Sequence, residues 1–181
     1  QVSFKSAYLR AHYPAEFMAA VISNEGGFYS TFAYLSEARR MGLAIFPPDV
    51  NASEWAYSGE GDRLRMGLMQ VKTIPKALGM TIMAERKQAG PYRSFQDFLR
   101  RVNPDPAHAR ALVRAGCCDS LSGELTRPAL LWRLYAATDA ESGPLPVPDD
   151  YSTAQKRAHE IESFGFLASR HPLTLYRKPI Q

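Results

Sequence analysis

Prolines and glycines divide this chain into short segments, and this spacing limits the folds that are open to it. The 181 residues include 13 prolines and 12 glycines. Proline fits the first turn of a helix but not its interior, and glycine often follows the last helical residue. Between these breakers, apolar residues recur at helical spacing. We therefore predict short helices in an irregular packing and not a long bundle.

Local start and stop signals give the approximate bounds of the expected helices. Ser94 and Asp97 have the spacing of a capping box, and Asp105 with Pro106 forms a cap followed by a proline at the first helical position. The expected helices begin at Pro14, run over 30–41 before Gly42, begin at Pro75 and stop before Gly90, follow Ser94, run from Pro106 to Gly116, and cover 126–137 and 152–163.

One stretch has the period of a β-hairpin instead. Apolar and polar residues alternate around Trp55 and Tyr57 and again from Leu64 to Leu68, with the glycine-containing loop 59–62 between them. A short apolar run at 43–46 reads as a buried strand. The predicted fold class is mainly α, with irregular multi-helix packing and one small β-hairpin.

The charge is modest overall but uneven along the chain. The net charge is +4, yet residues 63–114 carry eleven lysines and arginines against three acids. A basic central segment between more acidic ends fits either a surface that faces a polyanion or an arginine-rich helix surface exposed to solvent. Residues 141–150 contain three prolines and one glycine among acidic residues and read as a linker.

No catalytic site is recognisable in the residues themselves. The four histidines lack metal-ligand spacing, and nucleotide-binding glycine motifs and nucleophile elbows are absent. We assign no catalytic residue, no metal ligand and no cofactor. Cys117 and Cys118 are expected to be reduced, packed thiols. No apolar run is long enough to span a bilayer and no signal peptide is evident, so we expect no membrane partner and a cytoplasmic location.

Two basic groups are candidate anion sites. Arg39 and Arg40 end a helix, where they either complement its dipole or reach a phosphate. Lys72 and Lys76 flank a tight turn before a basic helix, where backbone N–H groups and lysines can meet phosphates; the alternative is a plain helix start with surface lysines.

Four segments together resemble one family, the bacterial C-family DNA polymerases, that is, the alpha subunit of DNA polymerase III. The resemblance lies in Tyr-Leu-Arg-Ala-His-Tyr-Pro-Ala-Glu-Phe-Met-Ala-Ala (8–20), Glu-Ala-Arg-Arg-Met-Gly-Leu-Ala-Ile-Phe-Pro-Pro-Asp-Val-Asn (37–51), Leu-Val-Arg-Ala-Gly-Cys-Cys-Asp-Ser-Leu (112–121) and Gly-Phe-Leu-Ala-Ser-Arg-His-Pro-Leu (165–173). They follow the family's order and approximate spacing over most of the chain.

The resemblance implies how the chain is organised. It places distal fingers-like helices and the hairpin at 1–65, a helix-hairpin-helix-like region at 66–140, the linker at 141–150, and a helix leading to a further module at 151–181. The implied function is a part of a DNA-directed DNA polymerase, a nucleotidyltransferase. The resemblance puts the Mg²⁺-binding aspartates in a palm upstream, so this piece alone is expected to be inactive and to hold no metal.

The resemblance also implies site residues and partners. It places Arg39 and Arg40 toward the triphosphate of an incoming dNTP. It places primer–template duplex DNA on the second group, which consists of Lys72, Thr73, Lys76, Arg86 and Lys87. The sliding clamp and other subunits of the polymerase III holoenzyme are further implied partners.

The chain departs from the family's pattern in two places. Met69, Thr73 and Pro75 stand where the family has glycines that let the backbone approach DNA, and proline has no N–H to donate. Residues 143–148 are at best a degenerate copy of the family's clamp-binding peptide. The degenerate clamp peptide and the short linker resemble the accessory, error-prone branch of the family. The loss of the glycines leaves an alternative function open, a helical protein-interaction scaffold that has lost DNA binding.

Overall fold

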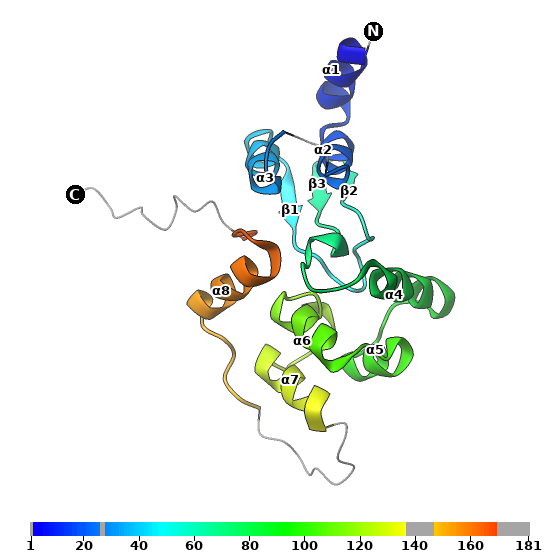
Figure 1. The fold of residues 1–181 in the computed structure, drawn as a ribbon, viewed down its shortest axis with the longest axis vertical. Helices are drawn as coiled ribbons and strands as arrows, with labels where there is room; N and C mark the ends of the chain where they lie inside the picture. The colour runs from blue at the N-terminus through cyan, green and yellow to red at the C-terminus, as the bar shows by residue number, and fades with distance from the viewer. Residues whose placement is uncertain (1, 26–27, 137–146, 170–181) are drawn as a thin grey trace, which may run out of the picture.

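The computed structural model describes residues 2–25, 28–136 and 147–169, and over these ranges the fold is mainly α (Figure 1). The elements, with η for a 3-10 turn, are α1 (Val2–His12), α2 (Pro14–Ser23), α3 (Thr31–Arg40), β1 (Ala44–Phe46), β2 (Ser58–Glu60), β3 (Arg63–Arg65), η1 (Leu68–Gln70), α4 (Lys76–Ala89), α5 (Phe95–Val102), α6 (Pro106–Arg114), η2 (Asp119–Leu121), α7 (Arg127–Ala136) and α8 (Thr153–Phe164). The mainly α class and the irregular packing of short helices are confirmed.

Helix starts lie where the local signals predict them. Pro14 and Pro106 take the first positions of α2 and α6. The Ser94 hydroxyl accepts a hydrogen bond of 3.1 Å from the N–H of Asp97, as a capping box requires. The Asp97 carboxylate, however, accepts from the N–H of Arg93 at 3.2 Å. The reciprocal capping box forms instead at α8, between Ser152 and Gln155.

The expected hairpin is present and is extended by a third strand. β2 and β3 pair antiparallel, and β1 lies beside β3 in parallel, so the strand order is β1-β3-β2. In this register Phe46 and Ser58 both lie opposite Arg65. The predicted strands around Trp55 and Leu68 are shorter than expected, because Leu68 already belongs to η1.

α2 and α3 cover one face of this sheet. The contact is closest at Gly59 in β2, where an added Cβ would lie 2.1 Å from the carbonyl carbon of Ala15 in α2. The chain therefore needs a residue without a side chain at this position. Leu64, the partner of Gly59 in β3, is fully buried under the same helices.

A single cluster of buried hydrophobic side chains extends from Ala15 to Ala168. It includes the fully buried Phe98 and the free thiols of Cys117 and Cys118, whose pKa values burial raises. The prediction of packed, reduced cysteines is confirmed. The regions proposed at 1–65, 66–140 and 151–181 all contribute to this cluster; the boundaries between them stay a prediction.

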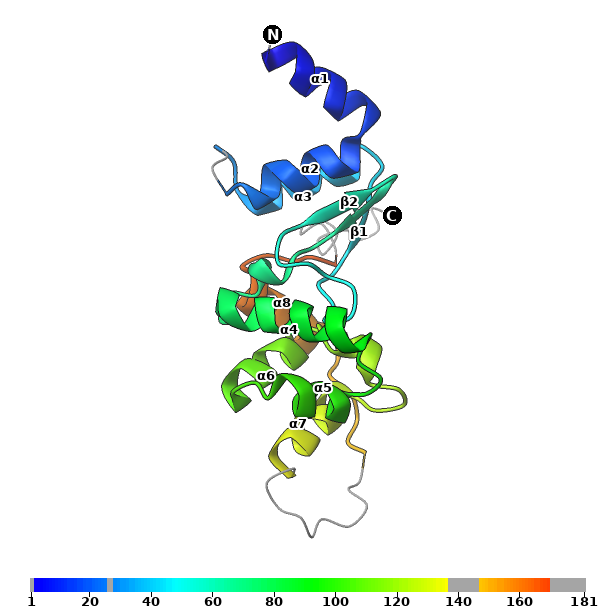
Figure 2. The same ribbon diagram turned by 90° about the vertical axis from the view of Figure 1, so that its right-hand side faces the viewer.

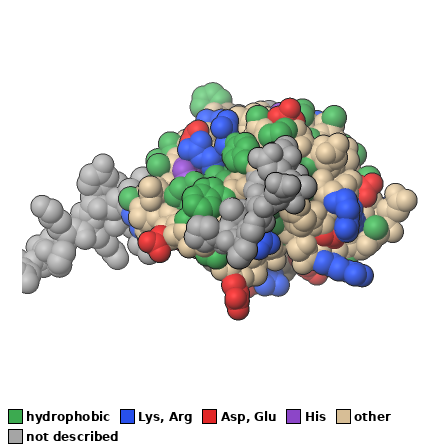
Figure 3. Space-filling model, turned by 90° about the horizontal axis from the view of Figure 1, so that it is seen from below, with side chains coloured by type: hydrophobic (Ala, Val, Ile, Leu, Met, Phe, Trp, Pro, Cys, Tyr) green, Lys and Arg blue, Asp and Glu red, His purple; other side chains and the backbone are tan. Residues whose placement is uncertain are grey.

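The helices form two tiers about the sheet. α1, α2 and α3 lie at one end, the sheet lies in the middle, and α4 to α8 gather at the other end (Figures 1 and 2). Seen from the α7 end, exposed hydrophobic side chains mingle with basic ones (Figure 3). Trp132 and Tyr135 of α7 are among the exposed aromatic residues. No helix in the described ranges combines the length and apolarity needed to cross a membrane.

Candidate nucleic-acid interface

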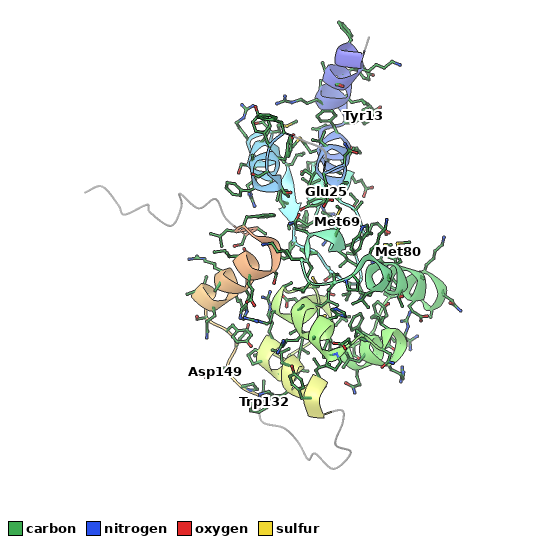
Figure 4. The ribbon with its side chains drawn as sticks, in the orientation of Figure 1. Tyr13, Glu25, Met69, Met80, Trp132 and Asp149 are labelled. Atoms are coloured by element: carbon green, nitrogen blue, oxygen red, sulfur yellow. The ribbon has the colours of Figure 1, made fainter. Side chains whose placement is uncertain are left out.

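The candidate interface is the tight turn 71–75 between η1 and α4, together with the start of α4. Lys72, Thr73 and Lys76 are all exposed here. In Figure 4, Met69 marks the approach to this turn from the small sheet, and Met80 lies on α4 beyond it. The structure thus brings three of the predicted DNA-binding residues together.

The backbone at this turn has unused donors. Pro75 is the N-cap of α4 and provides no side-chain cap. The N–H groups of Thr73, Lys76 and Ala77 have no hydrogen-bond acceptor among the residues that the structure describes. The first N–H groups of a helix point outward along its axis and carry the positive end of its dipole. This arrangement favours an anion at the start of α4.

The loss of the family's glycines does not strain the turn. None of Met69, Thr73 and Pro75 has a positive φ, so a residue with a side chain fits each position. Pro75 removes one donor, but as N-cap it leaves the N–H groups of the next two residues free.

A second helix lines the space beside the turn. A cavity of about 250 Å³ lies between Thr73 and α6, with His108, Arg110 and Arg114 on its α6 side. Arg114 is held by Glu162 of α8 at 2.6 Å, whereas Arg110 is exposed. We name Lys72, Thr73, Lys76, His108 and Arg110 the hairpin surface. Sequence reasoning missed His108 and Arg110, because only the packing of α6 brings them beside a turn more than thirty residues earlier.

Arg86 and Lys87 differ although they are neighbours in α4. Arg86 Nη1 donates to the carbonyl oxygens of Val50 at 3.1 Å and Ser53 at 2.9 Å, and Nη2 pairs with Glu54 at 2.8 Å. Only 14% of the Arg86 side chain is accessible, whereas Lys87 is exposed. Arg86 therefore fixes the loop 50–54 to α4, and its DNA contact stays a prediction.

Arg39 and Arg40 are both engaged within the protein. Arg39 is half-buried and donates through Nη2 to the carbonyl oxygen of Ala168, while Nη1 is buried without a partner among the described residues. Burial lowers the pKa of Arg39, and Glu160 opposes that shift. Arg40 is exposed and forms a two-point ion pair with Glu37, with both hydrogen bonds at 2.7 Å. The contacts of Arg39 and Arg40 with a nucleotide stay a prediction.

No three His, Cys, Asp or Glu side chains of the described ranges are placed to hold a metal ion. Residues 141–146, which cover most of the predicted linker and the start of the degenerate clamp peptide, lie outside the described residues.

Comparisons with known proteins agree with the hairpin assignment. A family model described as "Helix-hairpin-helix motif" matches residues 42–129, which include the turn, α4 and α6. DNA polymerase III subunit alpha of Thermus aquaticus is 32% identical over 97% of this chain and 16% of its own length. The protein of the same name from Treponema pallidum is 32% identical over 99% of this chain and 18% of its own length.

The error-prone branch is represented as well. The "Error-prone DNA polymerase" of Nocardia farcinica is 38% identical over 79% of this chain and 13% of its own length. The chain spans less than a fifth of the length of each of these relatives. Matches of this extent, together with the helix-hairpin-helix motif, identify the chain as a segment that belongs to the DNA polymerase III alpha-subunit family.

Proposed function

We propose that this chain is the part of a DNA-directed DNA polymerase that holds primer–template duplex by its phosphates. The observation that carries the proposal is the hairpin surface, where three backbone N–H groups without an acceptor in the described part of the chain share one turn with the exposed residues Lys72 and Lys76. Backbone donors and lysines contact phosphates without reading the bases. The grip is therefore independent of DNA sequence.

Two features of the chain support a phosphate site over a solvated helix surface. The excess of eleven basic over three acidic residues falls within 63–114, the same stretch that contains the turn, α4 and α6. His108 and Arg110 then add donors on the far side of the cavity from Thr73. α6 thus presents basic side chains to the cavity beside Thr73, which Glu162 of α8 also lines, while Lys72 and Lys76 lie in the adjoining turn and helix start.

Nucleotidyl transfer belongs to the whole polymerase in this proposal, and this segment contributes DNA positioning. The positioning of a dNTP by Arg39 and Arg40 and contacts to the sliding clamp stay predictions. The scaffold alternative predicts that an acidic protein, and not DNA, binds the basic surface.

Titration of a fluorescent primer–template duplex with the 181-residue chain tests the proposal. We expect binding at about 50 mM salt, and weaker binding for the double variant Lys72→Ala and Lys76→Ala. The matched control is Arg133→Gln, which removes an exposed charge from α7, away from the hairpin surface. Absence of duplex binding at low salt would favour the scaffold alternative.

A further inference from the structure

The face of the small sheet opposite α2 and α3 carries a second cluster of basic and aromatic side chains. Side chains alternate between the two faces of a strand. Gly59 and Leu64 face the helices, so the register places Phe46, Ser58 and Arg65 together on the other face. Glu60 and Arg63 form the neighbouring pair on that face.

This face is hollowed. A cavity of about 340 Å³ is lined by Phe46, Ser58, Glu60, Arg63 and Arg65. Its volume falls at the lower end of the range for small-ligand sites. A duplex has its bases inside and could offer such a hollow only a phosphate.

The guanidinium groups are arranged around one aromatic ring. The guanidinium carbon of Arg63 lies 4.8 Å from the centre of the Phe46 ring, and that of Arg65 lies 5.1 Å from it. Arg65 also donates from Nη1 to the carbonyl oxygen of Pro47 at 3.1 Å, which orients it. Neither arginine has a carboxylate partner among the described residues, although Glu60 lines the same cavity. Most of their N–H donors therefore stay available.

We propose that Phe46, Arg63 and Arg65 form a binding site for single-stranded DNA. The Phe46 ring supports the two flat guanidinium groups that lie over it, an unpaired base can stack on those groups, and their free N–H donors suit the adjoining phosphates. Charge complementarity favours a nucleic-acid strand over an acidic protein segment, because the site combines stacking surfaces with forked donors.

The site is distinct from the hairpin surface but follows it closely along the chain. Lys72 follows Arg65 by seven positions, so their Cα atoms lie within about 25 Å, the greatest reach of such a segment. A primer–template can therefore meet both, its duplex at the hairpin surface and its unpaired template strand on the sheet. The two proposed sites can therefore be tested separately, one with duplex DNA and one with single-stranded DNA.

Fluorescence anisotropy with a short labelled oligothymidine and the 181-residue chain tests this site. We expect the double variant Arg63→Gln and Arg65→Gln to bind about tenfold more weakly at 50 mM salt, and the salt slope to flatten by about 1.4, at about 0.7 for each lost contact. The single variant Arg63→Gln, which removes the charge of an exposed side chain, should weaken oligothymidine binding less than the double variant does and leave the fold intact. Affinity for a blunt-ended duplex, which offers no unpaired strand, should change by less than about twofold in these variants.

Two further variants make the result decisive. Phe46→Leu keeps both charges and removes the ring, so weaker oligothymidine binding supports a stacking site, whereas unchanged binding overturns it in favour of plain charge attraction. Arg133→Gln is the charge control and should bind as the parent does. Equal losses in Arg133→Gln and Arg63→Gln, or no loss in either, would overturn the proposal. If the double variant Lys72→Ala and Lys76→Ala loses duplex binding but keeps oligothymidine binding, the result supports a separate site on the sheet.

Discussion

The backbone N–H of Lys72 donates a hydrogen bond of 3.0 Å to the carbonyl oxygen of Ser163, in the last turn of α8. Gln70 reinforces the contact by donating from its side chain to the carbonyl oxygen of Phe164 at 3.1 Å. These bonds satisfy carbonyl groups that the end of a helix leaves free. α8 thereby holds the turn at Lys72, whereas the N–H groups of Thr73, Lys76 and Ala77 have no acceptor among the described residues.

The neighbouring residues Arg86 and Lys87 should respond oppositely to substitution. Arg86→Gln breaks two hydrogen bonds to buried carbonyl groups and an ion pair, and we expect it to lower the free energy of unfolding by about 2 kcal/mol or more. Lys87→Gln removes an exposed charge and should change it by less than about 0.5 kcal/mol. Urea denaturation measures both. Equal stability of the two variants would contradict the structural role of Arg86.

Arg39 and Arg40 form a second matched pair. Arg39→Ala removes the hydrogen bond to Ala168, whose N–H is itself held by Glu160 at 2.9 Å. We expect a loss of about 1–2 kcal/mol and faster amide hydrogen exchange at residues 168 and 169. In Arg40→Ala, which disrupts only an exposed pair with Glu37, the exchange of these amides should be unchanged. Unchanged exchange in Arg39→Ala would mean that this arginine does not hold the segment after α8.

Gly59→Ala should be one of the most damaging substitutions in the chain. The added methyl group would lie 2.1 Å from a backbone atom of Ala15, so α2 and the sheet would have to separate. We expect a loss of about 3 kcal/mol in the free energy of unfolding. Glu60→Ala, at the adjacent exposed position, is the control and should stay within about 0.5 kcal/mol. A thermal melt of Gly59→Ala that matches the control would refute the close packing of α2 on β2.

His159 makes stability depend on pH in the mildly acidic range. Burial lowers its pKa, Arg114 and Arg127 add to the shift, and Glu162 opposes it. Because the folded pKa lies below the unfolded value, the unfolded chain binds more protons as pH falls below about 6.5. Stability should therefore be greatest above that pH and fall below it. In the variant His159→Gln, the free energy of unfolding should fall less between pH 7 and pH 5 than in the parent chain. An equal fall in both would rule out His159 as the source of this pH dependence.

Local sequence signals predicted most of the helix starts. The elements that they did not predict depend on tertiary contacts. Pro14 and Pro106 mark helix starts because proline's preferred position depends only on its own helix. α1 was not predicted, since its hydrophobic residues Phe4, Tyr8 and Leu9 are exposed and form no buried stripe. The parallel pairing of β1 with β3 was also missed, because nothing in either strand specifies a partner across a long connection.

In the candidate site, too, local signals predicted some residues and tertiary packing determined others. Lys72 and Lys76 were predicted from the turn and the start of the following helix, and Thr73 from the family resemblance; the three lie together in the structure. Arg86 and Lys87 look equivalent in the sequence, yet only tertiary packing determines that one holds the loop 50–54 and the other is exposed. The sequence alone could likewise not predict that α6 would bring His108 beside Thr73.

The salt dependence of duplex binding tests the central claim most directly. Binding constants for a primer–template duplex should be measured from about 50 to 200 mM salt, for the parent chain and for the double variant Lys72→Ala and Lys76→Ala. If the hairpin surface grips phosphates, affinity falls steeply with salt in the parent, and the double variant flattens the slope by about 1.8, at about 0.9 for each lost contact. A parent chain that binds no duplex at 50 mM salt, or a double variant with the parent's slope, would contradict the account.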